Sequence, residues 1–554
     1  MSEFIFNRYD TIGVNAAEED RDYLSECFVE MGELPILRDV SDPRFLVVGR
    51  TGSGKTALFM QLAEICDNCS LIDANDRGFC YTERTTVLEE LSEKGLNLAP
   101  YLKLLWMHVL MIEVIQEVFT VDQKDSIMEW LKSLFPRKRS AKEEIALKFL
   151  EKYQGGFFTD TTEKTKQITE EFTQTLEKVK KNEIDAAAKL GEIVSIGSEG
   201  NAEDHASASH SHKTTYAIEE RGIEIISSDL ASKISTIPAV IDTLLDNRRK
   251  IVYIAIDRLD ESVISDTFRY QSLRGLVEAI RQLNQSVANL KIVVSIRTDL
   301  LDCILKKVKI QGQQYEKFKS LFLQLRWDKQ QLVDLAEKRV QKLVKKRYQP
   351  KSAVLLRELF PEKMHVPEGR TIPFEDYIIQ KSWDRPRDII DFINFCIKQA
   401  EGNNKVTQDM VRQAEKQYSG DRYVSLQEEW EKTIPEIKIL LDLLVGFKVG
   451  FDVASIDEEM IIDWANAVLG SGDPSSFLYR LASEYDRKSV GLVAFRNACL
   501  QSLYDAGAIG IKFSPTGTLR WGYRENYAYE KDNIHDDSSI RIHPGLWAHY
   551  GINE

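Results

Sequence analysis

The residues with the most specific chemistry form a glycine-rich loop near the start of the chain. The run from Phe45 to Thr56 contains the pattern G-x-x-x-x-G-K-[ST], with an apolar strand before it and a helical pattern after it. Such glycines let backbone N–H groups point at phosphate oxygens, and the following helix adds the positive end of its dipole. Lys55 is expected to reach the β- and γ-phosphates of ATP, and Thr56 to place its hydroxyl on Mg²⁺. The alternative is a strand-to-helix turn with an incidental lysine. The nucleotide-binding residues predicted from this stretch are Gly49, Arg50, Thr51, Gly52, Ser53, Gly54, Lys55, Thr56 and Ala57.

A second group of candidates follows a buried strand. Residues 251–256 form a continuous apolar run that ends in acids, as expected for a strand covered on both faces. The carboxyl ends of parallel strands form the ligand-binding edge of an open sheet. Asp257 is placed to hold Mg²⁺ through water, and Asp260 or Glu261 to orient and deprotonate the attacking water. The alternative is an exposed acidic turn at the strand end.

An arginine follows the next apolar strand. The strand that begins at Leu290 ends in the pattern Ser295-x-Arg297. A guanidinium beside a γ-phosphate makes bidentate, charge-assisted bonds that hydrolysis breaks. Arg297 is therefore a candidate phosphate sensor. An ion pair with Asp299, or with another carboxylate at the edge of the core, is the alternative.

Two more arginines flank a proline at a predicted helix start. Arg385 and Arg387 enclose Pro386, and proline is common in the first turn of a helix. From that position both arginines could reach the nucleotide from a lid domain. A salt bridge with Asp384 or Asp388 at the same helix start is the competing interpretation.

The elements that must position these residues predict an α/β fold. We expect a parallel-sheet P-loop NTPase core with a large helical insertion, a helical lid and a C-terminal winged-helix-like region. Its strands are expected at 45–48, 70–73, 250–256, 290–299 and 322–327. The expected segments are 1–82, a lead-in and the first part of the core; 83–245, the insertion; 246–330, the second part of the core; 331–407, the lid; and 408–554, the C-terminal domain.

The C-terminal domain contains a basic hairpin. Residues 495–524 are typical of a helix, a strand, a turn and a second strand, which is the outline of a winged helix. Such domains contact proteins as well as DNA, so both partners stay open. The hairpin residues that could contact a phosphate backbone are Lys512, Arg520, Trp521 and Arg524.

Composition limits the protein class. A chain of 554 residues with a net charge of −14 is long enough for several domains, and its surface as a whole does not suit nucleic acid. No run of about 18 apolar residues indicates a membrane span, and the start lacks signal-peptide character, so we expect a cytoplasmic protein with no membrane contact.

Three smaller patterns have structural interpretations. Cys66 and Cys69 have the spacing C-x-x-C without a second pair, which favours structural thiols. The basic cluster at 338–347 favours a solvated helix face. The polar stretch 197–212 with three histidines favours a mobile loop over a metal site.

Together these motifs resemble the AAA+-like and STAND P-loop ATPases. The stretches 18–29 and 48–56, with the Arg-Pro-Arg pattern, look like a family of bacterial P-loop ATPases, largely uncharacterised, whose relatives occur in anti-phage defence. The resemblance covers 1–80 and 245–400. It implies a three-layer sheet, ATP hydrolysis by Asp260 or Glu261, and a homo-oligomer in which a neighbour's arginine completes the site. Arg258 departs from the family pattern, which usually has glycine there, so the geometry of the acidic turn is open.

We expect an ATP-dependent molecular switch that self-associates and acts with a partner protein carrying the effector activity. A nucleic-acid-remodelling ATPase resembling replication initiators is the alternative, and a small-molecule kinase is disfavoured because the acidic strand end supplies a water-activating base.

Overall fold

The computed structural model describes most of the chain outside the expected insertion. The described residues are 4–73, 98–119, 145, 235–259, 266–301, 319–346, 354–366, 370–470, 473–486, 491–524 and 534–552. The chain divides into two compact units. The sheet unit comprises Gly32–Gly49 and Leu58–Gln324, and the C-terminal unit comprises Met1–Met31, Arg50–Ala57 and Leu325–Glu554. Of the glycine loop (Gly49–Thr56), the first residue belongs to the sheet unit and the residues from Arg50 onward belong to the C-terminal unit.

A five-stranded parallel sheet forms the centre of the sheet unit. Its strand order is β2-β3-β4-β1-β5, so β1 and β3 flank the central strand β4. Every residue of β3 and β4 is buried, which explains why both strands appear in the sequence as continuous apolar runs. All five strands expected from the sequence are confirmed. Their bounds are β1 (Leu46–Val48), β2 (Cys69–Asp73), β3 (Val252–Asp257), β4 (Leu290–Ile296) and β5 (Phe322–Gln324).

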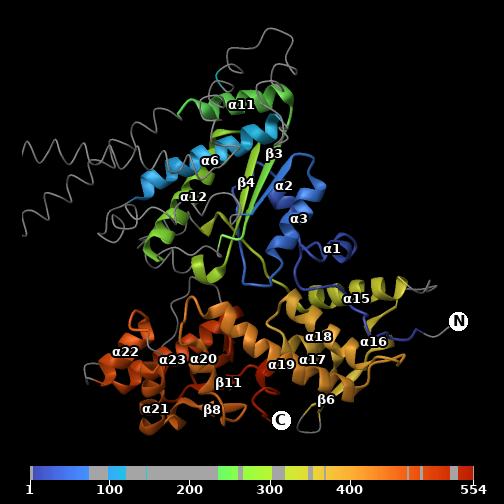
Figure 1. The fold of residues 1–554 in the computed structure, drawn as a ribbon, viewed down its shortest axis with the longest axis vertical. Helices are drawn as coiled ribbons and strands as arrows, with labels where there is room; N and C mark the ends of the chain where they lie inside the picture. The colour runs from blue at the N-terminus through green and yellow to red at the C-terminus, as the bar shows by residue number, and fades with distance from the viewer. Residues whose placement is uncertain are drawn as a thin grey trace, which may run out of the picture. The chain divides into compact units, whose positions relative to one another are not determined.

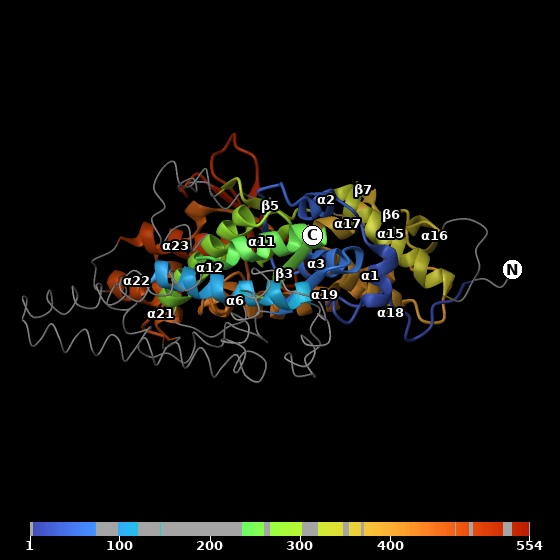
Figure 2. The ribbon, with the colours of Figure 1, turned by 90° about the horizontal axis from the view of Figure 1, so that it is seen from above.

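Helices lie on both sides of this sheet. Figure 1 shows α6, α11 and α12 together on one side of β3 and β4, and α2 on the other. Figure 2 shows α6 alongside α12 from above. These two helices approach closely at Gly275, where an added Cβ atom would lie 2.8 Å from the backbone nitrogen of Lys103. The helices are α2 (Glu33–Arg38), α3 (Lys55–Ile65), α6 (Ala99–Phe119), α11 (Ile237–Arg248) and α12 (Asp266–Ser286).

The described parts of the expected insertion at 83–245 are helical. They consist mainly of α6 and most of α11. Within the expected insertion, the sequence also has an amphipathic helical pattern at 168–179 and a basic stretch at 136–139. Both stretches, and the histidine-containing stretch 197–212, lie outside the described residues.

A helical domain occupies the first part of the C-terminal unit. Its buried core takes side chains from α15 to α19, and it also takes Phe6 and Ile12 from the N-terminal segment. The antiparallel hairpin β6–β7 was not expected from the sequence. The elements are α1 (Arg21–Cys27), α15 (Lys329–Lys345), α16 (Leu356–Leu359), β6 (Lys363–Val366), β7 (Arg370–Pro373), α17 (Phe374–Lys381), α18 (Pro386–Gln399) and α19 (Gln408–Trp430).

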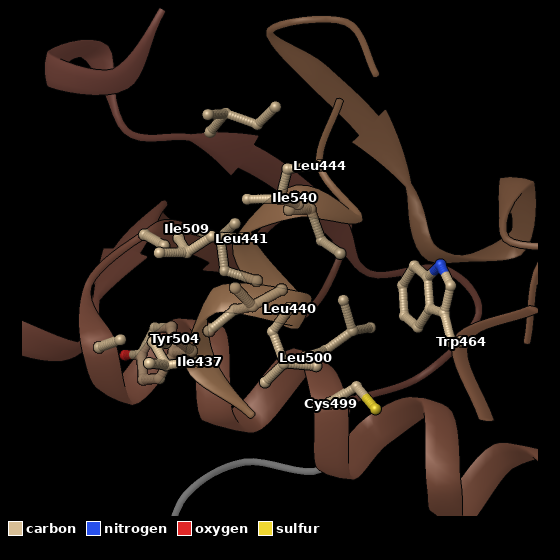
Figure 3. Packing of buried hydrophobic residues seen from close by; sticks show 14 of the residues in the cluster. Ile437, Leu440, Leu441, Leu444, Trp464, Cys499, Leu500, Tyr504, Ile509 and Ile540 are labelled. Atoms are coloured by element: carbon tan, nitrogen blue, oxygen red, sulfur yellow. The ribbon is translucent and has the colours of Figure 1, made fainter. Parts of the chain in front are cut away.

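A second core completes the C-terminal unit. Figure 3 shows leucines of α20 packed against α23 and against the strand residues Ile509 and Ile540. The expected succession of helix, strand, turn and strand is confirmed by α23, β9 and β10. Strands β8 and β11, which extend the antiparallel sheet to the order β10-β9-β11-β8, were not expected. The elements are α20 (Ile437–Asp442), β8 (Gly450–Asp452), η2 (Val453–Ser455), α21 (Glu458–Leu469), α22 (Phe477–Asp486), α23 (Leu492–Ala506), β9 (Ile509–Lys512), β10 (Arg520–Trp521), η3 (Gly522–Arg524), β11 (Ser539–Ile542) and η4 (Pro544–Leu546).

The basic cluster on α15 is only partly the solvated face that its sequence favours: Lys338 and Lys345 are exposed, but two other basic residues of the cluster are buried. Arg339 is buried and pairs with the buried Asp20 at 2.6 Å. Lys342 is also buried, and its Nζ atom contacts Asp22 at 2.9 Å and Glu26 at 3.0 Å. Charge periodicity on one helix does not reveal that an acidic helix from the other end of the chain, α1, covers it.

None of the helices that the structure describes has both the length and the hydrophobicity that a membrane span requires. Cys66 and Cys69 are free thiols, and burial raises the pKa of Cys69 to about 12, which fits the structural role expected for this pair.

Candidate functional site

At two positions of the glycine loop, the backbone has a conformation that only glycine adopts readily. Gly52 has a φ angle of 75° and Gly54 one of 94°, both in the left-handed region. The side chain of Lys55 folds back over the loop, and its Nζ atom donates a hydrogen bond to the carbonyl oxygen of Arg50 at 3.0 Å. Helix α3 begins at Lys55, so Thr56 and Ala57 lie in its first turn. The loop thus ends at a helix N-terminus, as an anion-binding loop requires.

The Arg-Pro-Arg segment (Arg385–Arg387) lies against this loop. Nη1 of Arg385 donates a hydrogen bond to the carbonyl oxygen of Thr51 at 2.9 Å. Arg387 packs over Gly52 so closely that an added Cβ atom at that glycine would lie 3.1 Å from the Cβ atom of Arg387. Both arginines of the segment therefore contact the predicted nucleotide-binding residues.

A buried ion network holds Arg385 in place. Its guanidinium contacts Asp388 at 2.9 Å and Glu429 at 3.0 Å, and all three side chains are almost completely shielded from solvent. Burial disfavours the charged carboxylates, but Arg385 and Arg422 outweigh this effect and lower the pKa values of Asp388 and Glu429 to about 2. Burial likewise disfavours the Arg385 guanidinium, yet the two carboxylates outweigh it and raise its pKa. The network is therefore ionised at neutral pH.

The salt bridge that was the competing interpretation of this helix start is also present. Arg385 does pair with Asp388, three residues later, as the sequence allowed. The same side chain uses a separate N–H group for Thr51, so the ion pair and the loop contact coexist. Glu429, which lies 44 residues from Arg385, was missed because no local pattern links it to the segment.

Some buried polar atoms at the loop have no hydrogen-bond partner among the described residues. They include the Oγ atom of Ser53 and the Nε atom of Arg387. Unsatisfied buried donors are costly and commonly indicate a missing ligand or water. Their position on and against the glycine loop fits an anionic group bound there.

An indole also contacts the loop. Nε1 of Trp327 donates a hydrogen bond to the carbonyl oxygen of Ser53 at 2.8 Å. An added Cβ atom at Gly54 would lie 3.8 Å from the same ring. The sequence had suggested only that Trp327 ends the region of the fifth strand.

The acidic edge belongs to the sheet unit. Asp257 is the last residue of β3, is buried, and accepts a hydrogen bond from the hydroxyl of Ser295 on β4. Asp73, which ends β2, pairs in register with Asp257. Because β1 to β4 are parallel, Gly49 leaves β1 at the same edge of the sheet.

Arg258 takes the backbone conformation that glycine favours. Its φ angle is 61°, and its guanidinium pairs with Asp73 at 3.0 Å. A non-glycine residue in this region costs free energy and needs support from its surroundings. The departure from the family pattern is thus accommodated, with Asp73 as a partner. Asp260 and Glu261, the two candidate bases, lie outside the described residues.

Arg297 forms the ion pair that was its alternative interpretation. Its Nε and Nη2 atoms contact the two carboxylate oxygens of Asp299 at 3.0 and 2.8 Å. A role as phosphate sensor stays a prediction. The use of Thr56 and Asp257 for Mg²⁺ also stays a prediction; among the described residues no group of three or more histidine, cysteine or acidic side chains could hold a metal ion.

The basic hairpin is only partly available to a partner. Trp521 is buried, and Arg524 pairs with Asp384 at 2.6 Å. Arg520 is exposed and Lys512 is half-buried. Two of the four residues expected to contact nucleic acid are therefore engaged within the C-terminal unit.

Comparison with known proteins supplies a distant relationship. Residues 330–427 match the model of the FunZ-associated C-terminal helical domain. That segment begins with α15 and contains most of α19, and these helices contribute to the core of the helical domain. The chain is also similar to an Escherichia coli (strain K12) protein described as "Putative transposon gamma-delta 80.3 kDa protein", with 22% identity over 563 residues, 99% of this chain and 68% of the relative.

Proposed function

We propose that the chain is a Mg²⁺-dependent ATPase that works as a molecular switch. In this proposal the fold is a P-loop NTPase core of the AAA+-like and STAND group, with the helical domain as its lid. The glycine loop binds the triphosphate, Asp257 and Thr56 hold Mg²⁺, and Asp260 or Glu261 activates water. The metal supplies charge compensation for the phosphate oxygens.

The hydrogen bond between Arg385 and Thr51 carries the proposal. It ties a loop whose sequence suits a triphosphate to a charged, buried network in the helical domain. The unsatisfied Nε atom of Arg387 and Oγ atom of Ser53 support an anion at the same place. A ligand that alters this loop would alter its contact with Arg385, which is what a two-state switch needs.

The wider role extends the same proposal. The protein acts in the cytoplasm, forms a homo-oligomer and recruits a partner protein that carries the effector activity, as in anti-phage defence. A second candidate is a nucleic-acid-remodelling ATPase, because the name of the E. coli relative refers to a transposon. The engagement of Trp521 and Arg524 within the C-terminal unit favours the switch over this candidate.

Titration with Mg²⁺ and ATP tests the proposal. Wild type is expected to bind ATP, and Lys55→Ala to bind it about tenfold more weakly or worse, since a charge-assisted contact is lost. Native mass spectra with ATP and with ADP should differ in oligomeric state. Equal affinity in wild type and Lys55→Ala would refute ATP binding through this loop. Strong stimulation of phosphate release by duplex DNA, with steep salt dependence, would instead favour the second candidate.

A further inference from the structure

One side chain of the glycine loop is bound by the C-terminal domain. Nη2 of Arg50 donates a hydrogen bond to the carbonyl oxygen of Ala506 at 3.1 Å. Its guanidinium carbon lies 5.8 Å from the ring centroid of Trp430 and 5.6 Å from that of Tyr523, within the range of cation–π attraction. All four residues belong to the C-terminal unit.

The acceptor of Arg50 is a helix end. Ala506 is the last residue of α23, a helix of 15 residues. The last carbonyl groups of a helix lack intrahelical partners and carry the negative end of its dipole. A guanidinium is therefore well suited to this position, and its contact with Ala506 is chemically specific.

Tyr523, one of the two rings near Arg50, contacts His543. Its hydroxyl lies 3.2 Å from Nε2 of His543, and Nδ1 of His543 accepts a hydrogen bond from the backbone N–H of Gly545 at 3.1 Å. The His543 ring stacks on Trp383 with centroids 3.8 Å apart. Burial lowers the pKa of His543 well below its ordinary value, so the ring is neutral, and the bond from Gly545 leaves its proton on Nε2, facing Tyr523.

This arrangement continues to the Arg-Pro-Arg segment. Trp383 lies two residues before Arg385, and its Nε1 atom donates a hydrogen bond to the carbonyl oxygen of Gly507 at 2.9 Å. Gly507 follows Ala506 directly. The loop is thus held at consecutive residues, Arg50 and Thr51, by one connected set of packed side chains.

We propose that Arg50 is a positioning residue that couples the glycine loop to the C-terminal domain, and that it acts on nucleotide affinity through Ala506, Trp430 and Tyr523. The inference rests on the proposed function, which it deepens. Anchoring Arg50 restrains the loop in the curled form in which Gly52 and Gly54 have positive φ angles. A preorganised loop binds its ligand more tightly, because less ordering is required upon binding. By linkage, ATP then stabilises the contact between the loop and the C-terminal domain.

A double-mutant cycle in the full chain tests this coupling. The ATP dissociation constant is measured with Mg²⁺ for wild type, Arg50→Ala, Tyr523→Leu and the double variant. We expect Arg50→Ala and Tyr523→Leu each to raise the ATP dissociation constant about 2- to 30-fold. The double variant should have a dissociation constant no higher than that of the single variant with the larger effect. Tyr523→Phe keeps the ring that faces Arg50, so its affinity should stay within about twofold of wild type. Arg520→Ala changes an exposed residue of the same hairpin and is the matched control, for which we expect an unchanged ATP dissociation constant.

The outcomes separate the two proposals. If Arg50→Ala weakens binding while Tyr523→Leu does not, or if the two effects add, Arg50 acts on the nucleotide directly and the coupling is wrong. Unchanged affinity in both single variants also overturns it. Thermal unfolding of Tyr523→Phe and Tyr523→Leu shows whether a loss reflects misfolding. If wild type binds no ATP, or Lys55→Ala binds it equally well, the proposed function fails and the coupling fails with it.

Discussion

Arg385 donates a hydrogen bond to the carbonyl oxygen of Thr51 at 2.9 Å while its other N–H groups contact Asp388 and Glu429. One buried guanidinium thus joins the glycine loop to two carboxylates on α18 and α19. The conformation of the loop and the stability of the helical domain therefore depend on the same side chain.

Removal of the charge on Asp388 should destabilise the C-terminal unit strongly. In Asp388→Asn the buried cations Arg385 and Arg422 lose a compensating charge, and breaking a buried pair typically costs about 3 to 5 kcal/mol. Denaturant unfolding followed by tryptophan fluorescence measures the loss. Glu278→Gln, which removes a half-exposed partner of Arg274 on α12, should cost less than about 1 kcal/mol. Similar losses for the two variants would contradict the special role of the buried network.

Acid should weaken the same unit in a defined pH range. The pKa values of Asp388 and Glu429 fall from ordinary values of 3.8 and 4.5 to about 2 in the folded protein. Because the folded values are depressed, the unfolded chain binds protons first, and the stabilisation is present above about pH 4.5 and lost as the pH falls towards 2. Thermal unfolding between pH 2 and 6 should show this slope, and the slope should be shallower in Asp388→Asn. An identical slope in that variant would show that other carboxylates dominate.

Substitution of either candidate base should slow ATP hydrolysis without a loss of ATP binding. Asp260→Asn or Glu261→Gln is expected to retain ATP while slowing phosphate release about 10²-fold or more, because general base catalysis is lost. Binding and single-turnover hydrolysis are measured on the same preparations. Turnover that is unchanged in both single variants would rule out both acids as the base.

Docking of α1 should depend on the buried ion pair between Asp20 and Arg339. Asp20→Asn leaves Arg339 as a buried, uncompensated cation, so the N-terminal segment should be cleaved faster in limited proteolysis. Asp22→Asn is the matched control: Asp22 also pairs with a lysine of α15, but it is exposed, and solvent can replace its charge. Equal protection of both variants and wild type would mean that apolar residues such as Phe6 and Ile12 hold the segment alone.

Local patterns predicted much of the fold. The apolar runs that become β3 and β4 are buried along their whole length. Because both faces of these strands are covered, nearly all their residues are apolar, and this makes the strands recognisable in the sequence. The glycine loop was equally visible, because the requirement for positive φ at Gly52 and Gly54 restricts residue type position by position. Strand β11 was missed, since four residues after a polar stretch carry too little periodicity to identify a strand.

Short patterns identified the candidate site residues and the strands next to them, because each such pattern depends on neighbours within a few positions. Folding, in contrast, selected the partners of the charged side chains. Arg50 reaches Ala506 across 456 residues, and Arg385 reaches Glu429 across 44. No spacing rule covers such distances: an ion pair or a cation–π contact forms wherever folding brings two groups together, and it leaves no repeat along the chain.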